Sequence, residues 1–403
     1  MKRTSYYLTT NVLIVSHVSS KRPEKTNNSG MILRLIFIAF SIATLSSCIT
    51  EYQPEAIAGQ SEMLIIDGTI TDGITIIRLS RSYGLNENFA GNIPITDAEV
   101  VVETKGGIRT MPGLQPERGR YEISTGLLNP DSLYRLHIRW GDDTYSSEFL
   151  QPLVTPAIDS IYYWKEGPGK PLQILVNSIN TATASPFYRW SFEEIWEFNA
   201  ELYAMGAMDP TADTLMIYDE REGPFNLKFN CWQRSKSNTL ILESTLQLIE
   251  NVINEKKIHE ILPGHKRISQ LYYIDVTQYS IRKTAYDYFS NLQKNIDEMG
   301  SIFAPIPSEL NGNVRCMNRD VPAIGYVDVC IPSKRNLFIS REQAQYEAPG
   351  KSCEVSENSR PGFGIYSIDN TGTIRGYAPF GCIDCTYNGG TKDKPAFWPN
   401  NHL

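Results

Sequence analysis

Histidine is scarce in this chain, and the familiar catalytic motifs are missing. Only five histidines occur, with no Gly-x-Ser-x-Gly elbow, His-Glu-x-x-His helix or phosphate-cradling glycine loop. The sequence also has no internal repeat, no heptad pattern and no apolar run of the ~20 residues that a membrane-spanning helix requires. A formal charge of −7 gives no basic surface for nucleic acid. These absences favour a non-enzymatic protein that uses no cofactor, and they disfavour nucleic-acid binding.

A lipoprotein signal is the most informative feature that is present. A short apolar run at residues 32–40 is followed by the stretch Leu45-Ser46-Ser47-Cys48, with small residues directly before the cysteine. This arrangement is typical of bacterial signal peptides whose cysteine is acylated. We therefore expect the mature chain to begin at Cys48 and to be tethered outside the cytoplasm by lipid chains such as palmitate, with each buried methylene contributing ~0.8 kcal/mol. The alternative is a transmembrane helix with an incidental cysteine.

The start of the chain fits this signal poorly, because a signal peptide normally begins close to its basic segment. Met31 is the better start, so residues 1–30 are either an over-extended gene start or an unusually long basic segment. On either reading, residues 1–47 form the leader and residues 48–61 form a short polar tether. Neither segment belongs to the fold.

Strand patterns begin directly after the tether and predict a mainly β protein. At residues 134–140, Tyr, Leu, Ile and Trp alternate with Arg, His and Arg before a Gly-Asp-Asp turn. Such strands over residues 62–153 predict a small sandwich, either immunoglobulin-like or transthyretin-like. Longer strands with insertions predict a larger β-rich domain, with disulfides, over residues 154–403. The strand-forming runs of the first part lie at residues 63–68, 74–79, 99–103, 120–123, 134–140 and 144–145.

The second part also carries an aromatic strand and one or two helices. Residues 188–198 place aromatic side chains on one face of a strand, with Glu194 as the exception on that face. Apolar residues spaced by three and four predict a helix that opens at Ser280 as N-cap and ends at Gly300. A weaker pattern predicts a second helix over residues 246–253.

Cysteines are the main covalent feature of the second part. Six remain once Cys48 is lipidated, and an even number in an exported chain favours disulfides. The preferred arrangement joins one cysteine of the C-terminal Cys-x-x-Cys motif to Cys231 or Cys353. This motif is interpreted as structural rather than as a zinc or redox site, because a turn follows it and no second such motif exists. The six disulfide candidates are Cys231, Cys316, Cys330, Cys353, Cys382 and Cys385.

The titratable residues outside the leader give no positive sign of catalysis. His137 alternates with arginines on the polar face of its strand, which favours a solvated residue. His259 and His265 flank a predicted Pro-Gly loop, and a metal pair there would need carboxylate partners that the sequence does not place. Glu193 and Glu194 are adjacent on a strand and point to opposite faces, which excludes them as one glycosidase dyad. We therefore assign no metal site and no catalytic residue.

Ordered landmarks along the chain are similar to those of a known family. They lie at residues 66–71 (IDGTIT), 96–100 (TDAEV), 187–190 (FYRW), 231–232 (CW), 278–280 (QYS), 300–303 (GSIF), 307–313 (PSELNGN), 325–326 (GY), 382–385 (CIDC), 389–391 (GGT) and 394–398 (KPAFW). As a set they resemble an uncharacterised lipoprotein family of Bacteroidetes-type bacteria, a domain of unknown function (DUF4249), over nearly all of residues 48–403. The resemblance implies export, an outer-membrane lipid anchor and a β-rich two-part fold, but no reaction. Members are often associated with TonB-dependent outer-membrane receptors, which suggests a partner.

These observations lead to one favoured function and two alternatives. The favoured function is an accessory or ligand-capturing subunit beside a TonB-dependent transporter. The alternatives are a glycan or peptide hydrolase whose site is spread over loops, and a structural envelope protein. Contacts with a ligand or partner are predicted at aromatic faces, although strand aromatics more often pack in a core. The candidate binding aromatics are Tyr188, Trp190, Trp196, Phe397 and Trp398.

Overall fold

A computed structural model describes most of the chain after the tether. The described residues are 63–82, 93–179, 185–208, 215–217, 228–248, 250–298, 310, 312–350, 353–369 and 371–400. The chain divides into two units, Met1–Gly59 and Gln60–Leu403, and all described residues belong to the second. The predicted leader, the acylated Cys48 and the tether therefore lie outside the described residues. Within the described ranges, no helix has both the length and the apolar character needed to cross a bilayer.

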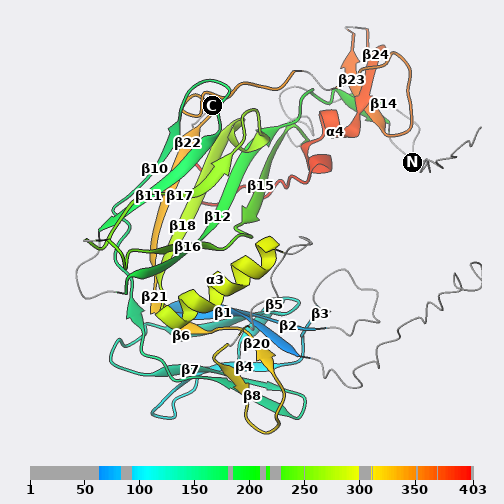
Figure 1. The fold of residues 1–403 in the computed structure, drawn as a ribbon. Coiled ribbons are helices and arrows are strands. Elements are labelled where there is room, and N and C mark those ends of the chain that lie inside the picture. Colours follow the sequence, from blue (N-terminus) through cyan, green and yellow to red (C-terminus); the bar gives the residue numbers. More distant parts are fainter. Residues whose placement is uncertain are drawn as a thin grey trace, which may run out of the picture. The chain divides into compact units, whose positions relative to one another are not determined.

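The prediction of a mainly β fold is confirmed (Figure 1). In the first part of the fold, two sheets contribute to one hydrophobic core. The eight described strands of sheet A are β1 (Leu64–Thr71), β2 (Gly73–Arg81), β3 (Ile93–Pro94), β5 (Leu114–Glu117), β6 (Arg120–Gly126), β9 (Leu153–Val154), β20 (Ala323–Ile324) and β21 (Asp328–Ile331). The four of sheet B are β4 (Glu99–Thr104), β7 (Tyr134–Trp140), β8 (Asp143–Ser147) and β19 (Val314–Cys316).

The strands of the first part follow the alternation in the sequence. Strand β7 spans the residues that the pattern predicts, with Tyr134, Leu136 and Ile138 buried and the polar residues that alternate with them more exposed. Its neighbour β8 begins at Asp143, and the two strands pair as an antiparallel hairpin. The core is therefore filled by alternate residues, as expected for a sheet with one buried face.

The first part is completed by residues from late in the chain, which differs from the expected boundary at residue 153. Strand β21 pairs in parallel with β1, and β19 pairs with β8. Val314, Val327 and Val329 belong to the same core cluster as β1 and β2. Local periodicity identifies a strand but not its partner, because pairing depends on how distant segments meet.

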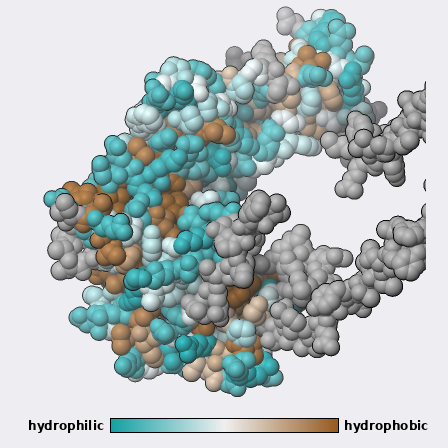
Figure 2. All heavy atoms as spheres, viewed as in Figure 1, coloured by the Kyte–Doolittle hydropathy of each residue, from teal (hydrophilic) through white to brown (hydrophobic). Residues whose placement is uncertain are grey.

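Sheets C and D form the second part. Sheet C contains β10 (Ser160–Lys165), β11 (Leu172–Ile179) and β17 (Val252–Ile261), and sheet D contains β12 (Phe187–Asn199), β15 (Asn230–Lys236), β16 (Ile241–Ser244), β18 (Leu271–Ser280) and β22 (Ser333–Ser340). Alternate residues of β12 and β18 join residues of β11 and β17 in one core cluster. The indole of Trp190 is satisfied inside this core, because its Nε1–H donates to Gln278 Oε1 at 3.0 Å. On the face drawn in Figure 2, hydrophilic residues cover most of the surface, and hydrophobic residues lie in scattered groups.

Helix α3 (Lys283–Glu298) confirms that a helix follows β18, but its first residue is Lys283 rather than Ile281, the residue after the predicted N-cap. Ser280 remains the last residue of β18, and its backbone N–H donates to Thr155 Oγ1 at 3.0 Å. The backbone N–H of Ile281 donates to Phe187 O, so sheet pairing continues past the predicted N-cap. Gly300, the predicted end, lies outside the described residues.

The second predicted helix, over residues 246–253, is wrong. Leu246 and Leu248 are exposed, and Val252 already pairs with Ile179 at the start of β17. The apolar residues spaced by three and four do not form a helix here. Ile253 packs in the core as part of strand β17 instead. Tertiary packing therefore overrides a short local pattern.

A small sheet and a C-terminal segment complete the described chain. Sheet E contains β13 (Gly206–Met208), β14 (Leu215–Ile217), β23 (Phe363–Ile368) and β24 (Ile374–Pro379). Helix α4 (Phe380–Ile383) and the 3-10 helix η2 (Cys385–Asn388) follow, and another 3-10 helix, η1 (Lys266–Ile268), precedes β18. Two disulfides, Cys231–Cys385 and Cys353–Cys382, fasten this part of the chain.

Candidate functional site

Glu194 is the most unusual residue of the core. It lies on β12 between Phe192 and Trp196, on the face that the sequence predicts to be aromatic, and its side chain is only 1% exposed. An isolated carboxylate in such a place would be strongly destabilising, so partners are required. The neighbouring Glu193 is exposed on the other face and pairs with Lys236. The prediction that the two glutamates point to opposite faces is confirmed.

The partners of Glu194 come from three other elements. Its Oε1 accepts from Arg267 Nε at 2.8 Å, and its Oε2 accepts from the hydroxyl of Tyr272 at 2.9 Å. His259 Nε2 lies 3.3 Å from Oε2, within ion-pair distance but without a hydrogen bond. Strands β17 and β18 and the 3-10 helix η1 thus converge on one carboxylate of β12. We call Glu194, Arg267, Tyr272, His259 and His265 the Glu194 network.

The network keeps Glu194 ionised. Burial raises the pKa of this carboxyl, but the nearby His259 ring, the Arg267 charge and the Tyr272 hydrogen bond outweigh it and leave the pKa lowered. Burial, and then the charge of Glu194, raise the pKa of Tyr272 well above its ordinary value. The Tyr272 hydroxyl therefore remains a donor throughout the physiological range.

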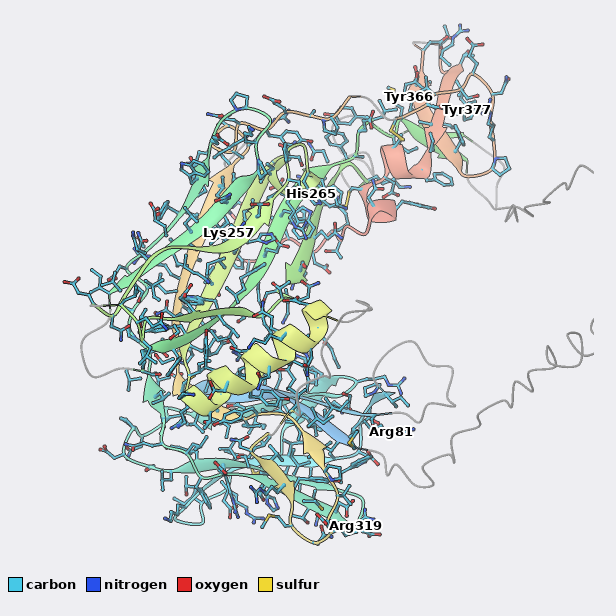
Figure 3. All side chains as sticks on the ribbon, in the orientation of Figure 1. Arg81, Lys257, His265, Arg319, Tyr366 and Tyr377 are labelled. Carbon is cyan, nitrogen blue, oxygen red and sulfur yellow. A yellow bond between two sulfur atoms is a disulfide. The ribbon has the colours of Figure 1, made fainter. Side chains whose placement is uncertain are left out.

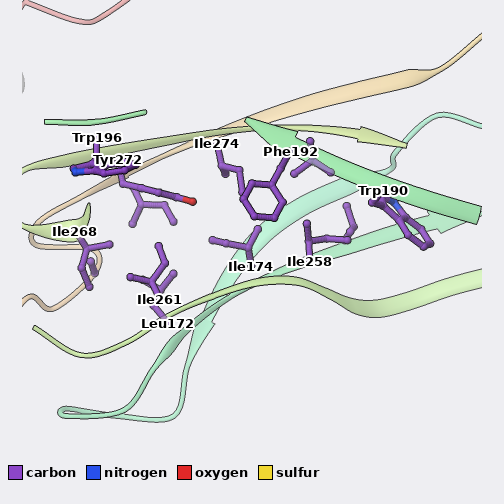
Figure 4. Packing of buried hydrophobic residues seen from close by; sticks show 14 of the residues in the cluster. Leu172, Ile174, Trp190, Phe192, Trp196, Ile258, Ile261, Ile268, Tyr272 and Ile274 are labelled. Carbon is purple, nitrogen blue, oxygen red and sulfur yellow. The ribbon is translucent and has the colours of Figure 1, made fainter. Parts of the chain in front are cut away.

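One end of the network is open to solvent. The Arg267 side chain is 25% exposed and stacks on Trp196, with 4.8 Å from the guanidinium carbon to the ring centroid. Figure 3 labels His265, whose Nδ1 accepts from the backbone N–H of Arg267 at the start of η1. Figure 4 shows Trp196 and Tyr272 side by side at the end of the core that also holds Ile268.

The structure supplies the carboxylate partner that sequence reasoning could not place for His259. His259 lies on β17 rather than in the predicted loop, while His265 caps η1. No three His, Cys, Asp or Glu side chains gather as metal ligands within the described ranges. The oxygens of Glu194 accept hydrogen bonds from Arg267 and Tyr272 instead. Sequence reasoning missed Arg267 and Tyr272, although the polar exception at position 194 indicated that partners were needed.

The predicted binding aromatics of β12 are in the core. Tyr188, Trp190 and Trp196 are almost fully buried, so they are not available as a binding face and this prediction is corrected. Their alternation with polar residues already places them on the sheet face that packs against β11 and β17. Trp398 is also buried, and its Nε1–H donates to Glu197 Oε2 at 2.7 Å.

Phe397 differs from the other four, because the residue is 54% exposed. Its ring centroid lies 4.8 Å from that of Tyr273 and 6.3 Å from that of Phe338. Tyr273 and Phe338 are cross-strand partners on β18 and β22, on the sheet face opposite the core. We call Tyr273, Phe338 and Phe397 the aromatic patch.

A row of charged and polar residues borders the aromatic patch on the same sheet face. Glu193 and Asp275 are directly opposite each other on β12 and β18, and they continue the row from Lys236 on β15 to Asn336 on β22. We call these four residues the polar row. Burial raises the pKa of Asp275; the charge of Lys334 opposes this, and the charge of Glu193 adds to it.

The disulfides agree with the preferred arrangement for four of the six candidates. Both cysteines of the Cys-x-x-Cys motif pair with distant cysteines, Cys382 with Cys353 and Cys385 with Cys231. This pairing fits the structural interpretation of the motif. The predicted disulfide pairing of the other two candidates is wrong, because Cys316 and Cys330 are free. They lie in different sheets, on β19 and β21, and Cys330 is fully buried.

Comparison with known families identifies the chain. The sequence model of one family, described as Domain of unknown function (DUF4249), matches residues 49–336. The chain belongs to the DUF4249 family. The DUF4249 match covers the first part of the fold and most of the second part. It ends within β22, two residues before Phe338. A comparison with curated proteins gave no match.

Proposed function

We propose that this DUF4249 chain is an outer-membrane lipoprotein, anchored through acylated Cys48, that captures a ligand beside a TonB-dependent transporter. The observation that carries ligand capture is the aromatic patch beside the polar row. An exposed aromatic ring next to fixed carboxylate and amide groups offers both apolar contact and orienting hydrogen bonds, which is the usual composition of a recognition surface. The transporter is suggested by the family resemblance.

The disulfides support the extracytoplasmic part of this proposal. Structural disulfides persist in oxidising compartments and are rare in the cytosol. The Cys231–Cys385 bond is buried and fastens the segment that carries Phe397 to β15. A patch held by a covalent link is pre-organised, which reduces the entropy lost when a ligand binds.

The anchor is tested by changing Cys48→Ala and following the protein between membrane and soluble fractions. We expect the variant to be released from the membrane, because the acylated residue is removed. An intact mass without lipid on Cys48, or a variant that stays in the membrane after a salt wash, would contradict the anchor.

Ligand capture is tested by complementation of a deletion strain. We expect deletion to impair uptake of one nutrient class while the envelope stays intact, and cross-linking to recover a β-barrel receptor. Phe397→Ala should fail to restore uptake. Trp164→Ala is the matched control, because Trp164 is similarly exposed but lies on β10 of sheet C, whereas Tyr273 and Phe338 lie on sheet D. Normal uptake with a weakened envelope would instead favour a structural envelope protein.

A hydrolase is the second candidate, and one observation favours it. Directly opposite residues of an antiparallel sheet have Cβ atoms about 4.5–5.5 Å apart, and the carboxyl groups of retaining glycosidases lie about 5–5.5 Å apart. Glu193 and Asp275 occupy such positions. Turnover of a glycan or peptide by the purified protein, abolished in Glu193→Gln or Asp275→Asn, would establish an enzyme.

A further inference from the structure

The contact between His265 and Arg267 contains one hydrogen-bond donor too many. Arg267 points two N–H groups at the same imidazole: its backbone N–H lies 3.1 Å from Nδ1, and its Nη1 lies 3.3 Å from Nε2. A neutral imidazole has only one acceptor nitrogen, because the other carries the proton. Whichever tautomer forms, one ring N–H faces an N–H group of Arg267. A protonated ring would face a donor on both sides.

The N-terminal cap of η1 decides between the two tautomers. An acceptor at Nδ1 caps the first turn of η1, and this contact is fixed by the backbone. Nε2 then carries the proton, so the Nε2–H of His265 and the Nη1–H of Arg267 form a pair of adjacent donors. Two donors side by side at a half-buried position can share one acceptor oxygen, supplied either by water or by a bound ligand.

Glu194 does not supply this acceptor. It is bound at Nε of Arg267, whereas the unsatisfied contact is at Nη1, and its other oxygen accepts from Tyr272. A third donor against the same guanidinium is also unsatisfied. Trp196 is 3% exposed and stacks on Arg267, yet its Nε1–H has no hydrogen-bond partner among the described residues.

Positive charge is in excess at this end of the core. Lys266 and Arg267 are adjacent, and Glu194 is the one carboxylate within the network. Burial, followed by the charges of Arg267 and Lys266, lowers the pKa of His265. Burial and the charge of Arg267 likewise lower the pKa of Lys266. The surroundings therefore oppose any further positive charge and favour an anion.

We propose that His265 and Arg267 form a binding site for an oxyanion, a carboxylate or phosphate group of a ligand. One oxygen accepts from both Nε2–H of His265 and Nη1–H of Arg267, and the partly exposed guanidinium leaves the site open to solution. Charge-assisted hydrogen bonds of this kind are the strong ones in proteins. This site is on the η1 side of the core and is separate from the aromatic patch, so it goes beyond the proposed function.

The site is located with the full-length protein labelled with ¹⁵N in its histidine rings. Acetate and inorganic phosphate are the probes, and sodium chloride at matched ionic strength is the control. We expect the His265 signals to shift with a saturable dependence on acetate or phosphate, while those of His137 stay in place. Saturation by acetate alone would assign a carboxylate ligand, and saturation by phosphate alone would assign a phosphorylated one. An equal shift in chloride would overturn the proposal.

His265→Asn is the decisive variant. The Asn side chain retains an oxygen that can cap the backbone N–H of Arg267, but it lacks the Nε2–H donor. We expect the anion-dependent rise in the midpoint of thermal unfolding to require about tenfold more anion than in the wild type. His137→Asn, the matched control in the first part of the fold, should respond as the wild type does. An unchanged response of His265→Asn, or a rise in midpoint without movement of the His265 signals, would overturn the site.

Discussion

At the scale of single residues, two positions carry more constraint than their neighbours. Gly390 lies against the Cys231–Cys385 disulfide, and a Cβ built on it would be 2.5 Å from Cys231 Cβ and 2.9 Å from Cys231 Sγ. Both atoms belong to a covalently fixed group that cannot rotate away. Glu194 is constrained for another reason, because its charge is buried and depends on partners from three elements.

Gly390→Ala is expected to destabilise the protein by about 1–3 kcal/mol, the usual consequence of overpacking a rigid site. Urea unfolding measures the change. Gly381→Ala is the control, because the nearest atom to its Cβ would be Asn388 Oδ1 at 3.4 Å, an ordinary contact. Equal stability of the two variants would show that the C-terminal segment shifts to accommodate the added methyl group without loss of stability.

Glu194→Gln is expected to lower the free energy of unfolding at pH 7 by about 3–5 kcal/mol, because Arg267 is left without its counter-charge. The pKa of Glu194 is lowered in the folded state, so its contribution is complete above the ordinary pKa near 4.3 and is lost as the pH falls through the lower folded value. The difference between wild type and variant should therefore shrink in acid. Urea unfolding across a pH series tests this, and exposed Glu193→Gln should change stability by less than about 1 kcal/mol. A difference that is constant with pH would contradict the assignment.

At the scale of elements, the two disulfides hold different parts of the second half. Cys231–Cys385 links residues 154 positions apart in the sequence and fastens η2 to β15. Cys353–Cys382 links residues only 29 positions apart, beside sheet E. The backbone adds to the first link, because Trp232 and Thr391 exchange two hydrogen bonds at 2.9 and 2.7 Å. The C-terminal segment is therefore an integral layer on sheet D.

Removing each disulfide by paired Cys→Ser changes is expected to cost about 5 kcal/mol for Cys231–Cys385 and about 4 kcal/mol for Cys353–Cys382, since the longer loop gains more entropy when it is opened. Thermal unfolding of the two double variants gives the comparison. We also expect loss of the first bond to raise protease cleavage near residue 390, since this bond fastens η2 to sheet D. A larger loss from the shorter loop would contradict this order.

At the scale of the whole molecule, the first part of the fold is discontinuous in sequence. Strand β21 lies between β1 and β9 in sheet A, and β19 forms the edge of sheet B next to β8. Hydrogen bonds also join the two parts, including Arg189 Nη2 to Thr69 Oγ1 at 2.9 Å. The chain thus returns from the second part to finish the first.

Residues 62–153 produced alone are therefore expected not to unfold cooperatively, because they lack the core valines of β19 and β21 and expose one edge of β1. Near-UV circular dichroism and urea titration measure this, with residues 60–403 as the control. A stable, cooperatively folded fragment would show that β19–β21 are dispensable.

Four features follow from the order of residues alone: the mainly β class, the position of β7, the two-faced character of β12 and the use of the C-terminal cysteines in disulfides. Each of these depends on alternation or on composition, which are properties of adjacent residues. The exception at Glu194 was also visible, since a carboxylate stood where the pattern required an aromatic ring.

Which distant groups meet depends on how the chain packs in three dimensions. This packing selected Arg267, 73 residues away, as the partner of Glu194, and it placed Asp275 opposite Glu193. It also buried Trp196 while leaving Phe397 exposed. The physical reason is that local periodicity fixes the face on which a side chain lies, whereas closure of long loops and burial of a shared core choose what covers that face.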